Sequence, residues 1–190
     1  MPGKRDKKKW HYHHSVRPFA NVGGRELAHI SDWRDDGMYD GESETLMEAW
    51  GVKDDSGGYT HFDSLGALLK SLEPAALRAA MMDTPEGFAW AVGKEYSVGR
   101  LVGPEEDNLV AHVLRERGLG ARLRPPAFDG ETLTFQALKV PPLWGPPCGP
   151  EVDGLARLVS IRFALDGMVM EREVVEELDW VERPKAEPKT

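Results

Sequence analysis

The sequence has a single cysteine, Cys148, and no apolar segment near the length needed to cross a bilayer. A lone cysteine excludes an internal disulfide and any metal site built from several thiolates. A membrane-spanning helix needs about 20 consecutive apolar residues, and the basic start of the chain lacks the apolar segment of a signal peptide. We therefore expect a cytoplasmic protein with no membrane-spanning segment.

Motifs that identify a reaction are also missing. The chain contains no glycine-rich phosphate-binding loop, no G-x-S-x-G nucleophile elbow and no H-E-x-x-H zinc motif. Cys148 lies between Pro147 and Gly149 with no histidine near it in the sequence. His112 is interpreted as a packed or surface histidine, and His61 as a residue at the start of a helix and not as a catalytic base. These absences favour a non-enzymatic function, and no cofactor is expected.

The charge of the chain is unevenly distributed. Apolar residues make up 41% of the sequence and charged residues 29%, as in soluble globular proteins. Residues 1–17 contain six basic side chains and one acidic side chain. Of the chain's net charge of −8, this segment carries +5 and the remainder therefore −13. We interpret the segment as a basic arm that precedes an acidic body.

Helical patterns dominate the middle of the chain. Leucines at helical spacing predict a helix over 64–72, capped by Asp63 or Ser64. Pro74 and Pro85 are each expected to open a further helix. A short helix is predicted over 44–50 and a longer one over 104–117, where acidic residues begin the segment and arginines end it.

Strand patterns follow, and one short strand precedes the helices. The segment "RELAHISDW" is interpreted as this early strand, and "FDGETLTFQALKV" has a turn signal followed by alternation. The strongest hairpin is "LVSIRFALDGMVMEREVV". With Asp166-Gly167 as a two-residue turn, apolar residues meet on one face and Arg162 lies opposite Glu171 on the other.

These patterns predict an α+β fold. A helical region over about 44–117 is expected to pack on an antiparallel sheet formed mainly by hairpins over about 121–181. The predicted organisation is an N-terminal arm at 1–17, a single globular domain at 18–181 and a polar tail at 182–190.

The stretch "KKKWHYHHS", residues 7–15, combines lysines with aromatic and histidine side chains. Lysines attract phosphates, and aromatic rings offer faces on which unpaired bases stack. Because the acidic body repels a phosphate backbone, RNA or DNA would have to be bound by this arm alone. The same stretch also suits a solvated tail, or one that folds back on the acidic body. The candidate nucleic-acid-binding residues are Lys4, Arg5, Lys7, Lys8, Lys9, Trp10, His11, Tyr12, His13, His14 and Arg17.

The three neighbouring histidines also suggest a metal site. His11 and His13 would point to the same side of a strand, with His14 adjacent. Zinc is held by three or four ligands, and no downstream motif supplies a matched fourth, so no metal is assigned. A metal-dependent hydrolase that uses this cluster with carboxylates of the acidic loop is kept as the alternative function. The acidic loop contains Asp32, Asp35, Asp36, Asp40, Glu42 and Glu44.

Two further segments are candidates for partner binding. The acidic loop fails as a calcium loop, because Arg34 and Ser43 occupy the third and twelfth positions counted from Asp32. The segment "PPLWGPP" either presents its tryptophan as a binding anchor or covers the edge of the sheet. The candidate partner-binding residues are Trp144, Asp35, Asp36 and Asp40.

The charge layout favours a non-enzymatic interaction protein. Its acidic body would dock on a protein partner or larger assembly, and its basic aromatic arm would contact nucleic acid or an acidic surface. An acidic inhibitor or immunity-type protein that masks a basic active site is a further alternative, because it needs only shape and charge.

Overall fold

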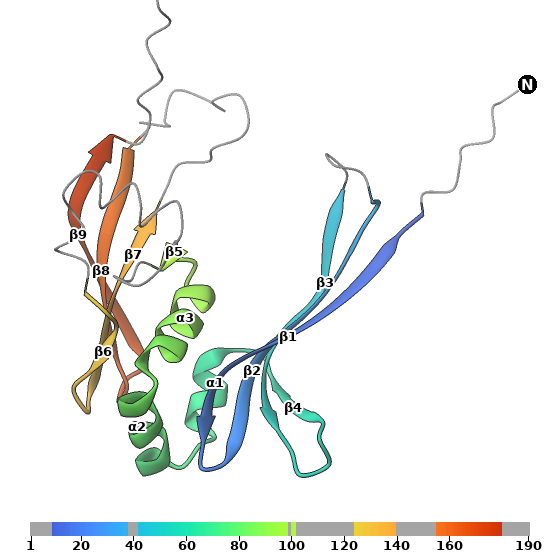
Figure 1. Cartoon of the computed structure of the whole chain (residues 1–190), viewed down its shortest axis with the longest axis horizontal. Coiled ribbons are helices and arrows are strands. Elements are labelled where there is room, and N and C mark those ends of the chain that lie inside the picture. Colours follow the sequence, from blue (N-terminus) through green and yellow to red (C-terminus); the bar gives the residue numbers. More distant parts are fainter. Residues whose placement is uncertain (1–8, 38–41, 99, 102–123, 140–154, 180–190) are drawn as a thin grey trace, which may run out of the picture. The chain divides into compact units, whose positions relative to one another are not determined.

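The computed structural model of the chain describes residues 9–37, 42–98, 100–101, 124–139 and 155–179. Strands occupy both ends of this described part, and three short helices lie between them in the sequence (Figure 1). The predicted α+β fold class is confirmed. The chain divides into two compact units, Met1–Ala80 and Met81–Thr190, and each is described by itself. The predicted single domain over 18–181 stays a prediction.

The first unit contains a four-stranded antiparallel sheet with the order β1-β2-β3-β4. Val22 lies opposite Arg25 across a turn in which Gly23 and Gly24 both have positive φ angles, 58° and 82°. Two such residues in succession are typical of the type I′ turns that connect twisted hairpin strands. The strands are β1 (His11–Val22), β2 (Arg25–Asp35), β3 (Ser43–Lys53) and β4 (Tyr59–Phe62).

The core of this sheet lies where the inner parts of β2 and β3 pair. Four consecutive residues are buried on each strand, 27–30 on β2 and 49–52 on β3. Because side chains alternate between the two faces of a strand, both faces of the sheet are covered at this point. Helix α1 (Leu65–Lys70) contacts β3 and β4 and is itself buried at Leu65, Leu68 and Leu69.

The three predicted helix starts at Ser64, Pro74 and Pro85 are confirmed. The hydroxyl of Ser64 accepts a hydrogen bond from the backbone N–H of Ala67, which caps α1. Helices α2 (Pro74–Asp83) and α3 (Pro85–Glu95) both begin at a proline, because the first helical position needs no N–H.

The second unit contains an antiparallel sheet with the order β5-β7-β8-β9, and β6 also pairs with β7. Helix α3 contacts β5, β6 and β7. Tyr96, which follows α3, lies against Phe163 of β8 with 6.4 Å between the ring centroids. The strands are β5 (Arg100–Leu101), β6 (Ala127–Phe128), β7 (Thr132–Lys139), β8 (Leu155–Ala164) and β9 (Val169–Asp179).

The register of the β8–β9 hairpin is the predicted one, with Val159 opposite Val174 and Arg162 opposite Glu171. The turn differs from the prediction. The strands end at Ala164 and resume at Val169, which leaves a four-residue turn in which Met168 has the positive φ, 50°. A longer turn about the same centre leaves the same residues opposite each other, so the register is unchanged.

The predicted helix over 44–50 is wrong, because these residues belong to β3. Trp50 is buried, at 3% exposure, but Leu46, which a helix would have placed inward beside it, is 46% exposed. Pairing with β2 over nearly the whole length of β3 outweighs the helical preference of the glutamate, leucine, methionine and alanine in this segment.

Several predicted features lie outside the described residues: the helix over 104–117, the segment around Trp144 and Cys148, and the tail over 182–190. In the part of the chain that is described, no helix is long and apolar enough to cross a membrane.

Candidate interaction surface

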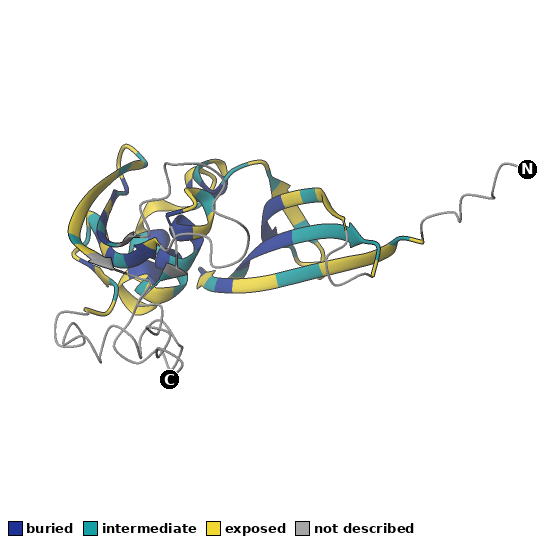
Figure 2. Cartoon of the chain, turned by 90° about the horizontal axis from the view of Figure 1, so that it is seen from above, coloured by how far each residue is buried: buried dark blue, intermediate teal, exposed yellow. Residues whose placement is uncertain are grey.

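Strands β1, β2 and β3 extend beyond the core as a twisted ribbon (Figure 1). We call residues 9–16, 31–37 and 42–48 the outer ribbon. None of these residues is buried, although β2 and β3 are fully buried in their inner parts. Figure 2 shows this change from buried to exposed along the strands. Neither face of the outer ribbon is buried by the other described residues of the first unit.

One face of the outer ribbon is held together by a histidine, a tryptophan and a carboxylate. His13 lies opposite Trp33 in the register, and their rings stack with 5.1 Å between centroids and 15° between planes. The Nε2 atom of His13 is also 2.8 Å from Oδ2 of Asp35. These contacts join β1 to β2 without a hydrophobic core.

The other face contains a second histidine–carboxylate pair and a cluster around Arg34. His14 Nδ1 pairs with Asp32 Oδ1. Arg34 donates hydrogen bonds to Glu44 of β3, and its guanidinium lies 4.5 Å from the centroid of the Trp10 ring. The hydrogen bond to Glu44, followed by one with Tyr12, raises the pKa of Arg34 above its ordinary value.

These contacts limit what the basic arm offers to nucleic acid. The described part of the arm forms the outer half of β1, and its histidines at 13 and 14 lie beside carboxylates of β2. Arg34 covers one face of Trp10, whereas Tyr12 is 68% exposed. The outer ribbon has two basic side chains and six carboxylates, a net charge of −4 with histidines counted neutral. Of the arm's candidate residues, Lys4, Arg5, Lys7 and Lys8 lie outside the described residues.

The structure does not bring the three histidines of the arm together as metal ligands. His13 pairs with Asp35 and His14 with Asp32, while the ring of His11 packs close to Gly37. Among the described residues, no group of three or more histidine, cysteine, aspartate or glutamate side chains could hold a metal ion. The alternative of a metal-dependent hydrolase therefore gains no ligand set.

The acidic residues predicted to bind a partner have local structural roles. Asp35 accepts a hydrogen bond from the backbone of Gly37, and Asp36 accepts one from the backbone of Glu42. Both carboxylates therefore shape the connection between β2 and β3. Asp40 and Trp144, the other two predicted partner-binding residues, lie outside the described part of the chain.

Sequence reasoning did not single out His29, which is 6% exposed. Its Nε2 atom lies 3.0 Å from Oε1 of Glu48, and its ring meets Trp50 edge to face with 4.9 Å between centroids. His29 marks the point where the buried sheet becomes the outer ribbon. Its place between the apolar residues Ala28 and Ile30 was the signal that could have identified a buried position.

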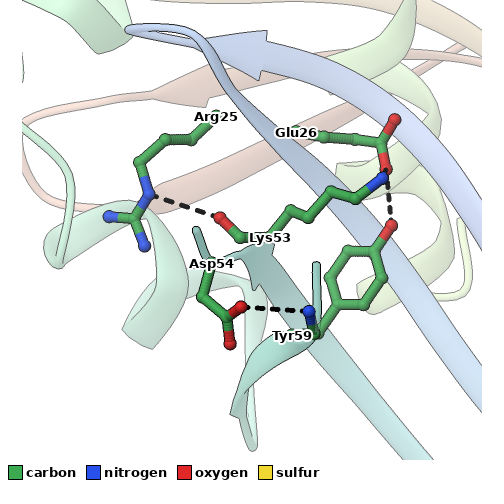
Figure 3. Close-up of polar contacts among 6 residues, drawn as sticks. Arg25, Glu26, Lys53, Asp54 and Tyr59 are labelled. Carbon is green, nitrogen blue, oxygen red and sulfur yellow. Dashed lines mark hydrogen bonds and ion pairs between the residues drawn. The ribbon is translucent and has the colours of Figure 1, made fainter. Parts of the chain in front are cut away.

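A second polar cluster that sequence reasoning missed lies at the inner end of the sheet (Figure 3). The Tyr59 hydroxyl donates a hydrogen bond to Glu26, and Lys53 lies 3.3 Å from the same carboxylate oxygen. The hydrogen bond from Tyr59, and then that from Lys53, holds the pKa of Glu26 below its ordinary value. The same carboxylate raises the pKa of Tyr59 to about 12.

This cluster predicts a pH dependence of stability at alkaline pH. The pKa of Tyr59 rises on folding from 10.0 to about 12. The stability that the hydrogen bond between Tyr59 and Glu26 contributes is therefore complete below pH 10.0 and is lost as the pH approaches about 12. Tyr59→Phe should lower the urea midpoint of unfolding at neutral pH. The difference in urea midpoint between this variant and the unmodified protein should disappear between pH 10.0 and about 12. Glu26→Gln should remove the same dependence. A gap that stays constant up to pH 12 would contradict this assignment.

Comparisons with known proteins assign no role to the outer ribbon or to the Tyr59 cluster. Comparison of the chain with models of protein families, with curated proteins and with solved structures finds no match. A function for this chain has to be argued from its own residues.

Proposed function

We propose that the protein is a non-enzymatic interaction protein that docks on a protein partner or assembly through the outer ribbon. The observation that supports this is burial: no residue at 9–16, 31–37 or 42–48 is buried on either face. A sheet ordinarily needs a hydrophobic face packed on something. The large side chains of Tyr12 and Leu46, 68% and 46% exposed, are of the kind that a partner covers.

The charges support a protein partner more than nucleic acid as the main contact. A phosphate backbone carries charge along its whole length and would meet the six carboxylates of the outer ribbon, whereas a protein segment can carry its carboxylates only at the end that meets the basic residues. One open aromatic ring also gives little surface for base stacking. The basic residues Lys4 to Lys9 would then contact an acidic surface of the partner. A cytoplasmic location is part of the proposal, because a single cysteine fits a reducing compartment.

Site-specific photocrosslinking tests this proposal. A photoreactive phenylalanine analogue would replace Tyr12 in the outer ribbon or, as a control, the exposed Thr60 of β4 in the same unit. After irradiation in the native cells, adducts would be identified by mass spectrometry. We expect one defined protein adduct from position 12 and none from position 60.

Two outcomes would contradict the proposal. Equal adducts from positions 12 and 60 would mean that the outer ribbon is no preferred contact. An RNA or DNA adduct from position 12 without a protein adduct would identify nucleic acid as the partner instead. A salt series with the purified chain would then measure how many phosphates it contacts.

A further inference from the structure

We propose that the outer edge of β1 accepts an extended, acidic segment of the partner as an additional antiparallel strand. This inference rests on the interaction function proposed above and specifies how the contact is made. Strand addition gives affinity through main-chain hydrogen bonds and specificity through side chains on alternate faces.

The first argument is that β1 has a free edge of sufficient length. β1 is the first strand in the order β1-β2-β3-β4, and no described strand pairs with its outer side. Its pairing with β2 is regular from His11 to Pro18, where a bulge interrupts it. Proline and a bulge are features that block strand addition, so the open edge is His11–Val16.

The second argument is that the other long strand edges carry charged side chains that hinder pairing with a further strand, whereas this edge carries none. Among the described strands, the neighbour of β3 on the side away from β2 is β4, which pairs only with Trp50 to Lys53. The outer part of β3 carries Glu44 and Glu48. Strand β9 has five carboxylates and one arginine. Charged side chains are a common means of preventing unwanted pairing at an edge. Residues 11–16 contain no lysine, arginine, aspartate or glutamate.

The third argument concerns the charge of the incoming segment. Exposed Lys9 lies two residues before the open edge, and the sequence before it adds Lys4, Arg5, Lys7 and Lys8 against one aspartate. Next to this edge, the carboxylates of Asp32 and Asp35 are already paired with histidines of β1. An antiparallel segment with carboxylates toward its C-terminal end would bring them beside the lysines.

A peptide probe tests this inference directly on the full chain. An 11-residue peptide with the sequence of Val169–Asp179 is suitable, because it is acidic, has three of its five carboxylates in its last four residues and forms a strand in this protein. At saturating peptide, we expect hydrogen exchange of the amides in His11–Val16 to slow by about tenfold or more, with no change in β4.

Matched probes separate strand pairing from general attraction. The same peptide with its five carboxylates replaced by lysine should bind roughly tenfold more weakly. The same peptide with proline at the two central valine positions should leave the exchange of His11–Val16 unchanged, because it cannot complete the hydrogen-bond ladder.

Two adjacent variants of the protein test the edge from the other side. Successive N–H groups of β1 point alternately toward β2 and outward, so one of Ser15→Pro and Val16→Pro removes only an outward donor. The variant that keeps the thermal stability of the unmodified protein should bind the acidic peptide about tenfold more weakly.

The outcomes distinguish this inference from the function on which it rests. A protein crosslink from position 12 combined with unchanged exchange at residues 11–16 would overturn strand addition and leave the interaction function standing. Equal binding of the acidic and the lysine peptides would overturn the acidic partner. Protection of residues 11–16 by an RNA or DNA oligonucleotide, but by no peptide, would overturn both.

Discussion

Replacing Phe163 with alanine is expected to destabilise the second unit by about 3–5 kcal/mol. Phe163 is 1% exposed near the C-terminal end of β8 and lies opposite Leu133 of β7 and Met170 of β9. Its ring also contacts Tyr96 after α3. The truncation would remove apolar contacts on three sides and leave a cavity that neighbouring strands cannot fill without shifting.

Hydrogen exchange during chemical denaturation measures this loss and locates it. In Phe163→Ala, the free energy of the opening that exposes amides of β7, β8 and β9 to hydrogen exchange should be lower than in the unmodified protein. Val169→Ala is the control, because Val169 is 54% exposed in the same hairpin and its truncation should change stability by no more than about 0.5 kcal/mol. Similar losses for the two variants would mean that Phe163 does not belong to the core.

Replacing Gly51 with alanine is expected to destabilise the first unit by about 1–3 kcal/mol. A Cβ atom at this buried position of β3 would lie 2.8 Å from Cδ1 of Ile30 and 3.0 Å from Cδ1 of Tyr59. Ile30 is itself 2% exposed, so its side chain has little room to retreat. The Tyr59 ring would have to move away from the position in which its hydroxyl reaches Glu26.

The same substitution at Gly66 should have the opposite sign. Gly66 lies within α1, and a Cβ atom there would meet nothing within 4 Å. Alanine is favoured over glycine inside a helix by up to about 1 kcal/mol. Urea denaturation of both variants gives the comparison, and a stabilising effect of Gly51→Ala would show that the space beside β3 is larger than these distances allow.

The parts of the fold that the sequence predicted correctly depend on local chemistry. Proline at the start of α2 and α3, and serine before α1, each satisfy a requirement of a helix terminus within a few residues. The β8–β9 register follows from pairing two short segments so that Phe163 meets Met170 and Arg162 meets Glu171. The helix starts and the hairpin register each depend on residues that are close together in the sequence, so one sequence is enough to predict them.

The first sheet was harder to predict because its signals are not local. The segment over Ser43–Lys53 contains good helix formers, and its strand conformation follows from pairing with β2. The inner parts of β2 and β3 are buried on both faces, so the alternation that usually identifies a strand is missing there. In the outer ribbon, polar residues occur on both faces, so the alternation of apolar and polar residues is missing there as well.

The candidate site shows the same limit. The sequence drew attention to the histidines and tryptophan of the arm and to the carboxylates near Asp35, but it joined the histidines to the carboxylates only as ligands of a metal. The structure places His13 against both Trp33 and Asp35, a pairing that depends on the β1–β2 register. The Tyr59–Glu26 contact joins residues 33 positions apart, and no spacing rule could have identified it.

The absence of buried residues in the outer ribbon has a consequence for how this protein can change over evolutionary time. Most substitutions that lower stability severely act in a core, and surface changes usually alter stability by less than about 0.5 kcal/mol. Residues such as Tyr12 and Leu46 can therefore vary with little effect on the folded state. A lineage could acquire new partner preferences through the outer ribbon while selection on residues 27–30 and 49–52 preserves the fold.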